Sequence, residues 1–218
     1  CRGAASAAGW RVWGCPMPVK NRFAELLPEI IAWRRDFHAH PELMFDLPRT
    51  AGRVADLLRG FGVDELVEGI GRSGVVAVIR GRTDSRGRAI GLRADMDALP
   101  ITEETGLPHA STTPGKMHAC GHDGHMAMLL GAAKYLAETR AFDGTAVLVF
   151  QPAEEGGGGG DEMVRDGLME RFGIDEIYGM HNWPGMPLGS FAIREGAVMA
   201  ACDQFRITVT GRGGHAAK

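Results

Sequence analysis

The sequence predicts an α/β fold, a sandwich of helices packed on a sheet, and two observations carry that prediction. Two segments place apolar residues at the three- and four-residue spacing of an amphipathic helix, and a third long helix follows. Short segments rich in branched residues alternate with these helices, as strands do in an α/β protein. With 218 residues, 44% of them hydrophobic, the chain can bury one large domain, or one domain and part of another.

The elements are expected in a definite order along the chain. Helices are expected over residues 23–37, ending near Pro41, over residues 48–61, and onward from about Asp123. Strands are expected over residues 74–81, 89–95 and 145–152. Residues 203–211 alternate apolar and polar side chains, which predicts a strand with one solvated face and the start of a second sheet.

Composition and charge exclude several classes of function. The formal net charge of -3 provides no basic face for a nucleic acid, and no apolar run approaches the ~20 residues of a membrane-spanning helix. Four scattered cysteines (Cys1, Cys15, Cys120 and Cys202) do not form the dense framework of a small secreted domain, so reduced thiols are expected. We therefore expect a soluble, cytoplasmic protein without nucleic-acid or membrane partners.

The two ends of the chain differ from the rest. Residues 1–16 show neither a signal-peptide pattern nor a helical or strand period, which predicts a non-native leader with Met17 as a candidate start. Mass spectrometry of the natural protein's N-terminus tests this, because a peptide covering residues 10–16 would contradict it. At the other end, the chain stops at Lys218 just past the expected strand, which predicts a fragment.

Three polar clusters each follow an expected strand: RADMD at 93–97, FQPAEE at 150–155 and YGMHN at 178–182. Sites in open α/β sheets are built where strands end. Asp95 and Asp97 are two residues apart, so on an extended segment they point the same way. Glu154 and Glu155 are adjacent and can face different partners, one a metal and the other a water.

The segment CGHDGH, residues 120–125, adds a thiol and imidazoles to these carboxylates. Thiolate, imidazole and carboxylate are the donors that Zn, Mn, Co or Ni sites use. A lone cysteine is usually a small buried apolar residue, but the glycines at 121 and 124 and the helix beginning beside them favour a site at Cys120 and His122. These residues predict a hydrolase with two divalent metal ions.

Several other polar residues have alternative roles. His38 and His40 in FHAHPE could be metal ligands, but they close an amphipathic helix, which favours packing. Asp123 could cap the helix that begins beside it. His118 and His125 could either contact a substrate or lie on the surface.

Two further features are interpreted as structural. The run GGGGGD at 156–161 lacks the Lys-Ser/Thr pair of a phosphate loop, so we expect a flexible connection there instead of a nucleotide site. Met199 and Cys202 are expected in the core.

Six motifs occur in a fixed order: RRDFHAHPEL, GLRADMDALPI, MHACGHDGHMAMLLGAA, VFQPAEEGGGG, GMHNWP and GRGGHAA. Together they resemble the M20 metallopeptidase-like amidohydrolases, in the branch that contains hippurate hydrolase, N-acyl-amino-acid amidohydrolases and indole-acetyl-amino-acid hydrolases. The resemblance covers residues 17–218 almost continuously. It implies the N-terminal part of a two-metal α/β catalytic domain over residues 17–200. It also implies the start of a smaller α+β lid, which dimerises, over residues 201–218.

Position by position, the resemblance implies four metal ligands: Cys120, His122, Glu155 and His181. It implies that Glu154 is the general base, and Asp97 matches an aspartate that orients a ligand. His215 matches a lid histidine that reaches a neighbouring subunit's site. Asp95 stands where relatives in other branches have a histidine ligand, so it is interpreted as a supporting residue. The family's last histidine ligand has no counterpart in this chain.

The implied reaction is hydrolysis of the amide bond of N-acyl amino acids, which gives a carboxylic acid and a free amino acid. A metal-activated water would attack, Glu154 would move its proton, and His215 would donate to the oxyanion. The implied partners are a small N-acyl amino acid and a second copy of the protein, bound through the lid.

Two alternatives to this function stay open. A metallo-dipeptidase or aminopeptidase would use the same site. The missing ligand favours a non-catalytic remnant for the chain as it stands. The fragment itself is expected to be inactive.

Overall fold

The computed structural model describes residues 4–5, 11–14, 21–200, 205–215 and 217, and of residues 4–14 only the backbone. By its internal contacts the chain divides into two units. One unit contains residues 19–184, and the other contains residues 1–18 and 185–218.

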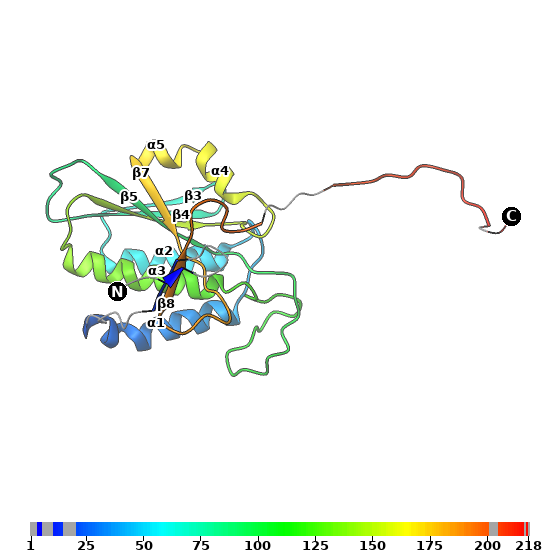
Figure 1. Ribbon diagram of the computed structural model, residues 1–218, viewed down its shortest axis with the longest axis horizontal. Helices are drawn as coiled ribbons and strands as arrows, with labels where there is room; N and C mark the ends of the chain where they lie inside the picture. Colours follow the sequence, from blue (N-terminus) through cyan, green and yellow to red (C-terminus); the bar gives the residue numbers. More distant parts are fainter. Residues whose placement is uncertain (1–3, 6–10, 15–20, 201–204, 216, 218) are drawn as a thin grey trace. The chain divides into compact units, whose positions relative to one another are not determined.

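The larger unit is built on a five-stranded sheet in the order β3-β4-β6-β5-β7 (Figure 1). The strands are β3 (Glu65–Ile70), β4 (Gly74–Arg80), β5 (Ala89–Asp95), β6 (Thr145–Gln151) and β7 (Ile174–Gly179). β4 is antiparallel to β3 and β6, whereas β5 is parallel to both β6 and β7. The sheet is therefore mixed, and β5, β6 and β7 end at the same edge.

Helices cover both faces of this sheet (Figure 1). On one face lie α1 (Asn21–Ala39), α2 (Pro48–Phe61) and α3 (His122–Thr139), and on the other the short α4 (Gly159–Arg165) and α5 (Leu168–Phe172). The predicted α/β fold is confirmed. Among the helices of the described residues, none is both long and apolar enough to cross a membrane.

The alternation of side chains along β4 divides the core between the two faces. Val75 and Ile79 belong to the apolar cluster beneath α1, α2 and α3. Val76 belongs to a second cluster with Met163 of α4 and Leu168 of α5. Because successive strand residues point to opposite faces, a strand that is buried along almost its whole length, as β4 is, requires a helical layer on each side.

Local sequence explains where the helices of the first layer begin and end. α2 has Pro48 in its first turn and ends at Gly62, whose φ of 74° is the left-handed conformation that glycine adopts without strain. α3 buries Met126, Leu130 and Ala133, which repeat at intervals of four and three residues. This stripe faces the sheet and places the first turn of α3, with His122, at the edge where β5, β6 and β7 end.

Three elements of the larger unit are not predicted by the sequence. β3 carries Glu65 and Glu68 and has no clear apolar alternation, and α4 and α5 are too short for a helical period to be visible. The glycine run at 156–161, expected as a flexible connection, enters α4 at Gly159, so that expectation is wrong for its second half.

The smaller unit contains an antiparallel sheet of β1 (Ala4–Ala5), β2 (Arg11–Gly14) and β8 (Ser190–Ile193). The sequence shows no strand period at 1–16 and does not predict β1 or β2. The strand expected at 203–211 is not formed over its described part, because residues 205–215 have no regular structure. Met199 is 57% exposed, so its expected place in the core is wrong, and Cys202 lies outside the described residues.

Candidate metal centre

Four short segments of the larger unit meet at the edge where the parallel strands end. Asp95 ends β5 and Asp97 follows it, Glu154 and Glu155 follow β6, and His181 follows β7. Cys120 and His122 come from the entrance to α3. The register explains the meeting, because Asp95 pairs with Gln151 and so brings the segment after β5 beside the segment after β6.

His122 is the centre of this cluster. Its ring is fully buried, and Nδ1 donates to the main-chain oxygen of Asp97 over 2.7 Å. A carbonyl oxygen only accepts, so the proton of the neutral ring lies on Nδ1 and Nε2 carries a lone pair. Nε2 is buried and has no hydrogen-bond partner.

Three carboxylates surround the Nε2 atom of His122. Its distance is 3.5 Å to Oδ2 of Asp95, 3.7 Å to Oε1 of Glu155 and 3.8 Å to Oε2 of Glu154. Oε1 of Glu155 is also buried without a hydrogen-bond partner, and Asp95 Oδ2 is balanced only by Arg93, whose Nη1 is 2.7 Å away. So many acceptors facing one another favour a bound cation, since buried polar atoms are normally paired.

Cys120 and His181 complete a second side of the cluster. The Sγ of Cys120 is 3.3 Å from Nε2 of His181, whose Nδ1 donates to the main-chain oxygen of Asn182 over 2.6 Å. His181 therefore presents the lone pair of Nε2 just as His122 does. Two groups of donor atoms each lie within 4.8 Å of one another. One group is Cys120, His122 and His181, and the other is His122, Glu154 and Glu155.

The two adjacent glutamates differ in exposure. The side chain of Glu154 is 42% exposed, whereas that of Glu155 is 18% exposed. Asp97 holds the backbone of both, because its Oδ1 accepts from the Glu154 N–H over 3.0 Å and its Oδ2 from the Glu155 N–H over 3.1 Å. Asp97 thus orients His122 with its main chain and the glutamate pair with its carboxylate.

Three groups of the cluster have raised pKa values, whereas that of Asp95 is lowered to about 2, because the effect of burial is outweighed by the hydrogen bond to His125 and nearby positive charges. Burial, and the negative charge of Glu155, raise the pKa of the Cys120 thiol to about 12. Burial also raises the pKa of Glu155. For His122, burial alone lowers the pKa, but the hydrogen bonds to Asp97 and the charge of Asp95 outweigh it and raise the pKa. The same negative field that retains protons here attracts a divalent cation in their place.

Two supporting residues are not singled out by sequence reasoning. Arg93 pairs with Asp95 and donates through Nε to Gln151 Oε1 over 2.8 Å. Asn182 binds His125, and its backbone N–H reaches Nε2 of that ring at 3.1 Å. Both lie inside the polar clusters at the strand ends, so their position is a signal, but Gln151 and His125 come from other segments, β6 and α3.

Gly121 allows the turn between Cys120 and His122 to close on Asn182. Its φ is 90°, in the left-handed region, and a Cβ built there would lie 2.6 Å from the Asn182 amide. The backbone conformation therefore favours glycine, and a larger side chain would have to displace the Asn182 amide.

The other histidines have contacts of their own, although the donor atoms of His125, Asp95 and His122 also lie within 4.8 Å of one another. Nδ1 of His125 donates to Asp95 Oδ1 over 2.6 Å, and its Nε2 contacts Asn182, so the ring is buried and orients Asp95. His118 is also buried, and burial lowers its pKa to about 4. A place on the surface is therefore wrong for both. His40 binds the Asp36 carbonyl within α1, as the packing alternative predicts.

Asp123 does not cap α3. The cap position is Gly121, without a side-chain cap hydrogen bond, while Asp123 is buried and pairs with His38 of α1 at 2.7 Å. His38 thus has a packing role, as its place at the end of a helix predicts. His215 lies in the smaller unit, and its predicted role stays a prediction.

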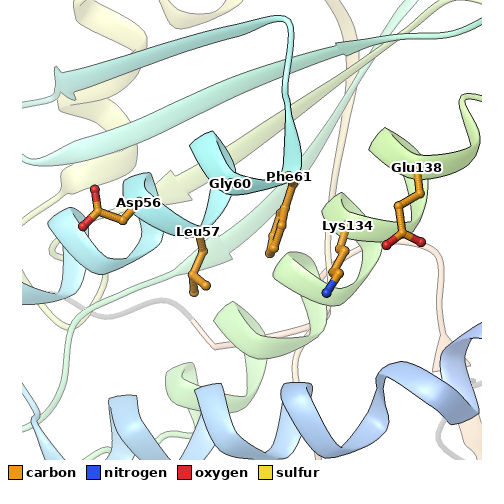
Figure 2. Close-up of a pocket in the computed structure, with 6 residues that line it drawn as sticks. All are labelled: Asp56, Leu57, Gly60, Phe61, Lys134 and Glu138. Carbon is orange, nitrogen blue, oxygen red and sulfur yellow. The ribbon is translucent and has the colours of Figure 1, made fainter.

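A cavity of about 270 Å³ lies elsewhere in the larger unit, between α2 and α3 (Figure 2). Its lining residues are Asp56, Leu57, Gly60, Phe61, Lys134 and Glu138. Lys134 is paired with Glu29 at 2.8 Å and Glu138 with Arg22 at 2.7 Å, so two of its charged groups already have partners. Lys134 is twelve residues along α3 from His122, or about 18 Å, so this cavity is separate from the cluster.

The fold and the cluster together define an α/β protein with a candidate transition-metal centre. One thiol, two imidazole lone pairs and buried carboxylates without hydrogen-bond partners fit divalent metal ions. The chain belongs to peptidase family M20/M25/M40, whose model matches residues 91–217.

Individual relatives agree with this assignment. A hippurate hydrolase of Campylobacter jejuni is 50% identical over 201 residues, which cover 87% of this chain and 50% of the relative. An N-acyl-L-amino acid amidohydrolase of Geobacillus stearothermophilus is 45% identical, covering 91% of this chain and 53% of the relative. The chain spans about half the length of these relatives.

A solved structure supports the fold and the metal centre. A dinuclear metal-binding peptidase of the M20 family from Bacillus subtilis superposes with a TM-score of 0.71 at 41% identity. The match covers 76% of this chain and 46% of that protein.

Proposed function

We propose that the protein containing this chain hydrolyses the amide bond of N-acyl amino acids and uses two divalent metal ions held at the cluster around His122. The observation that carries the proposal is the buried Nε2 lone pair of His122, fixed by the hydrogen bond to Asp97 and surrounded by carboxylates. The relatives that hydrolyse hippurate and N-acyl amino acids support the substrate class.

The proposed metal ligands are Cys120, His122, Glu155 and His181. Both imidazoles present Nε2 after their Nδ1 atoms have donated to main-chain oxygens. Glu155 is the more buried glutamate of the pair and has an oxygen without a hydrogen-bond partner. A mixed set of sulfur, nitrogen and oxygen donors suits Zn, Mn, Co or Ni.

Glu154 is the proposed general base. Its side chain is more open to solvent than that of Glu155, yet its Oε2 is only 3.8 Å from His122 Nε2, so it borders the ligands and faces incoming molecules. Bound divalent ions supply Lewis acidity, which polarises the amide carbonyl and acidifies the attacking water. Glu154 accepts the proton of that water and passes it to the leaving amine, which yields a carboxylic acid and an amino acid.

Asp97 is proposed to position both the ligand His122 and the pair Glu154 and Glu155. It fixes the tautomer of His122 and anchors the backbone of the glutamate pair. His215 is proposed to donate to the oxyanion from the lid of a second subunit of a homodimer. Its support is the GRGGHAA motif.

A peptidase with the same centre is the second candidate, favoured by the similarity to a solved M20 peptidase. The test uses the protein encoded by the complete reading frame, loaded with metal, and compares benzoylglycine with dipeptides at equal concentration. The proposal predicts a higher kcat/KM for benzoylglycine, with loss of turnover in Glu154→Gln. Preference for dipeptides would establish the peptidase, and turnover of neither would favour a non-catalytic protein.

A further inference from the structure

A cluster of buried charged side chains joins the end of α1 to the candidate metal centre. His38 lies one residue before the end of α1, with Nδ1 2.7 Å from Oδ2 of Asp123 and Nε2 3.2 Å from Oε1 of Glu103. Arg34, one turn earlier, places Nε 2.7 Å from the same Asp123 oxygen. The side chains of His38, Asp123 and Glu103 are 4%, 1% and 2% exposed, so solvent does not compete for these contacts.

The two ring nitrogens of His38 bridge the two carboxylates, and the guanidinium of Arg34 adds a positive charge beside Asp123. Burial by itself raises the pKa of Glu103, but hydrogen bonds from Thr105, the Ser111 backbone and His38 outweigh it and lower that pKa to about 2. Glu103 is therefore ionised at neutral pH.

The two carboxylates lie on either side of the metal-ligand turn in sequence. Asp123 directly follows His122 in the first turn of α3. Glu103 belongs to the segment between β5 and α3, which contains no helix or strand and leads into Cys120. The end of α1 also holds this segment at Thr112, whose backbone N–H and Oγ1 donate to the Ala39 carbonyl over 2.8 and 2.7 Å.

We propose that His38 is a positioning residue, which fixes the turn from Cys120 to His122 by binding the chain before it and after it at once. His38 does not itself hold a metal, because both ring nitrogens face Asp123 and Glu103. The importance of His38 for catalysis rests on the proposed function, whereas its positioning of the turn is a property of the metal-free chain.

The experiment compares His38→Gln with wild type and with His40→Gln. His40 is a matched control just past the end of α1, where its Nδ1 contacts Asp36 of that helix. Amide hydrogen exchange is followed by mass spectrometry on the metal-free chain. The reporters are the amides of Gly124 and His125, which bind the Gly121 carbonyl. In His38→Gln these amides and the hydrogen-bonded amides of Ala110, Ser111 and Thr112 exchange about tenfold faster or more, while β4 and β6 keep their protection.

His40→Gln is expected to exchange like wild type. Unchanged exchange near the turn in a folded His38→Gln protein would overturn the proposal. An equal loss of protection in every element would also overturn it, because such a loss indicates a purely structural role. If His38→Gln does not fold, Glu103→Gln replaces it, since it keeps the shape of the side chain and removes only the charge. Faster exchange at Ala110–Thr112 and at Gly124 supports the proposal, and unchanged exchange contradicts it.

Cobalt affinity separates this inference from the proposed function. Supporting residues of metal ligands affect affinity by about 10–100-fold, so we expect that loss in His38→Gln and none in His40→Gln, measured by competition with a coloured chelator. Equal cobalt affinity in wild type and His38→Gln would contradict the positioning role. If wild type bound no cobalt while the local exchange effect held, the positioning would stand and the metal proposal would fail.

Discussion

The tautomer of His122 decides what the candidate site can bind. Its Nδ1 donates to the Asp97 carbonyl, which leaves a buried lone pair on Nε2 in a field of carboxylates. Sequence alone identifies His122, Cys120 and the glutamate pair, because they lie at strand ends and at a helix entrance. It does not identify Arg93 or Asn182 as supports, because their partners, Gln151 and His125, lie on separate segments.

The two adjacent glutamates provide a test at the scale of single residues. Glu154→Gln keeps the side-chain shape but cannot accept a proton, so turnover of the complete protein should fall by about 10²–10⁴-fold while metal content is kept. Glu155→Gln replaces an anionic donor with a weak neutral one, so metal content should fall and added metal should partly restore activity. Elemental analysis and kcat measurements check both variants.

A reversed pattern would exchange the two roles. If Glu154→Gln lost metal and Glu155→Gln kept it while inactive, the exposed glutamate would be the ligand. The family motif would then be aligned one residue out of place.

At the scale of elements, the spacing of apolar residues predicts those helices and strands that pack in a core. Six elements are predicted in this way: α1, α2, α3, β4, β5 and β6. The strand expected at 203–211 fails although its pattern is correct, because a strand needs a hydrogen-bonded neighbour. Residues 205–211 pair with none in the described chain, so Phe205 and Val209 remain exposed.

The turn before α3 allows a matched pair of glycine substitutions. Gly115→Ala meets no atom within 4 Å, so it costs only the left-handed backbone strain of its φ of 74°, about 1–2 kcal/mol. Gly121→Ala has similar strain and also collides with Asn182, which adds about 1–3 kcal/mol. Urea unfolding of the metal-free chain measures both. Equal losses of stability would show that the approach of Asn182 to this turn is not tight.

The segment between β5 and α3 should show a characteristic pH dependence through Glu103. Its pKa is lowered from 4.5 to about 2 in the folded protein, so the ionised form stabilises the fold above pH 4.5. We expect Glu103→Gln to be about 2 kcal/mol less stable than wild type at pH 7, because charged hydrogen bonds are lost. This difference should shrink as pH falls from about 4.5 toward 2.

Urea unfolding of both proteins at several pH values gives this difference directly. A difference between wild type and Glu103→Gln that stayed constant down to pH 3 would mean that Glu103 has an ordinary pKa in the folded chain.

At the scale of the whole molecule, the chain provides a candidate metal centre on a family M20/M25/M40 fold and spans about half the length of the hippurate hydrolase and amidohydrolase relatives. The predicted α/β class is confirmed, since alternating helix and strand patterns leave few other arrangements. The role of His215 and the dimer stay predictions. They depend on the lid expected at residues 201–218, and the described part of that range, 205–215 and 217, has no regular secondary structure.

X-ray absorption at the zinc edge of the zinc-loaded chain tests the metal centre most directly. A centre built on Cys120 and His122 should place a sulfur atom at about 2.3 Å from zinc, together with nitrogen and oxygen atoms at about 2.0–2.2 Å. In Cys120→Ser the sulfur contribution should disappear while the other cysteines remain. A spectrum of the wild-type chain with nitrogen and oxygen alone, or a sulfur signal that survives Cys120→Ser, would contradict a metal centre built on Cys120 and His122.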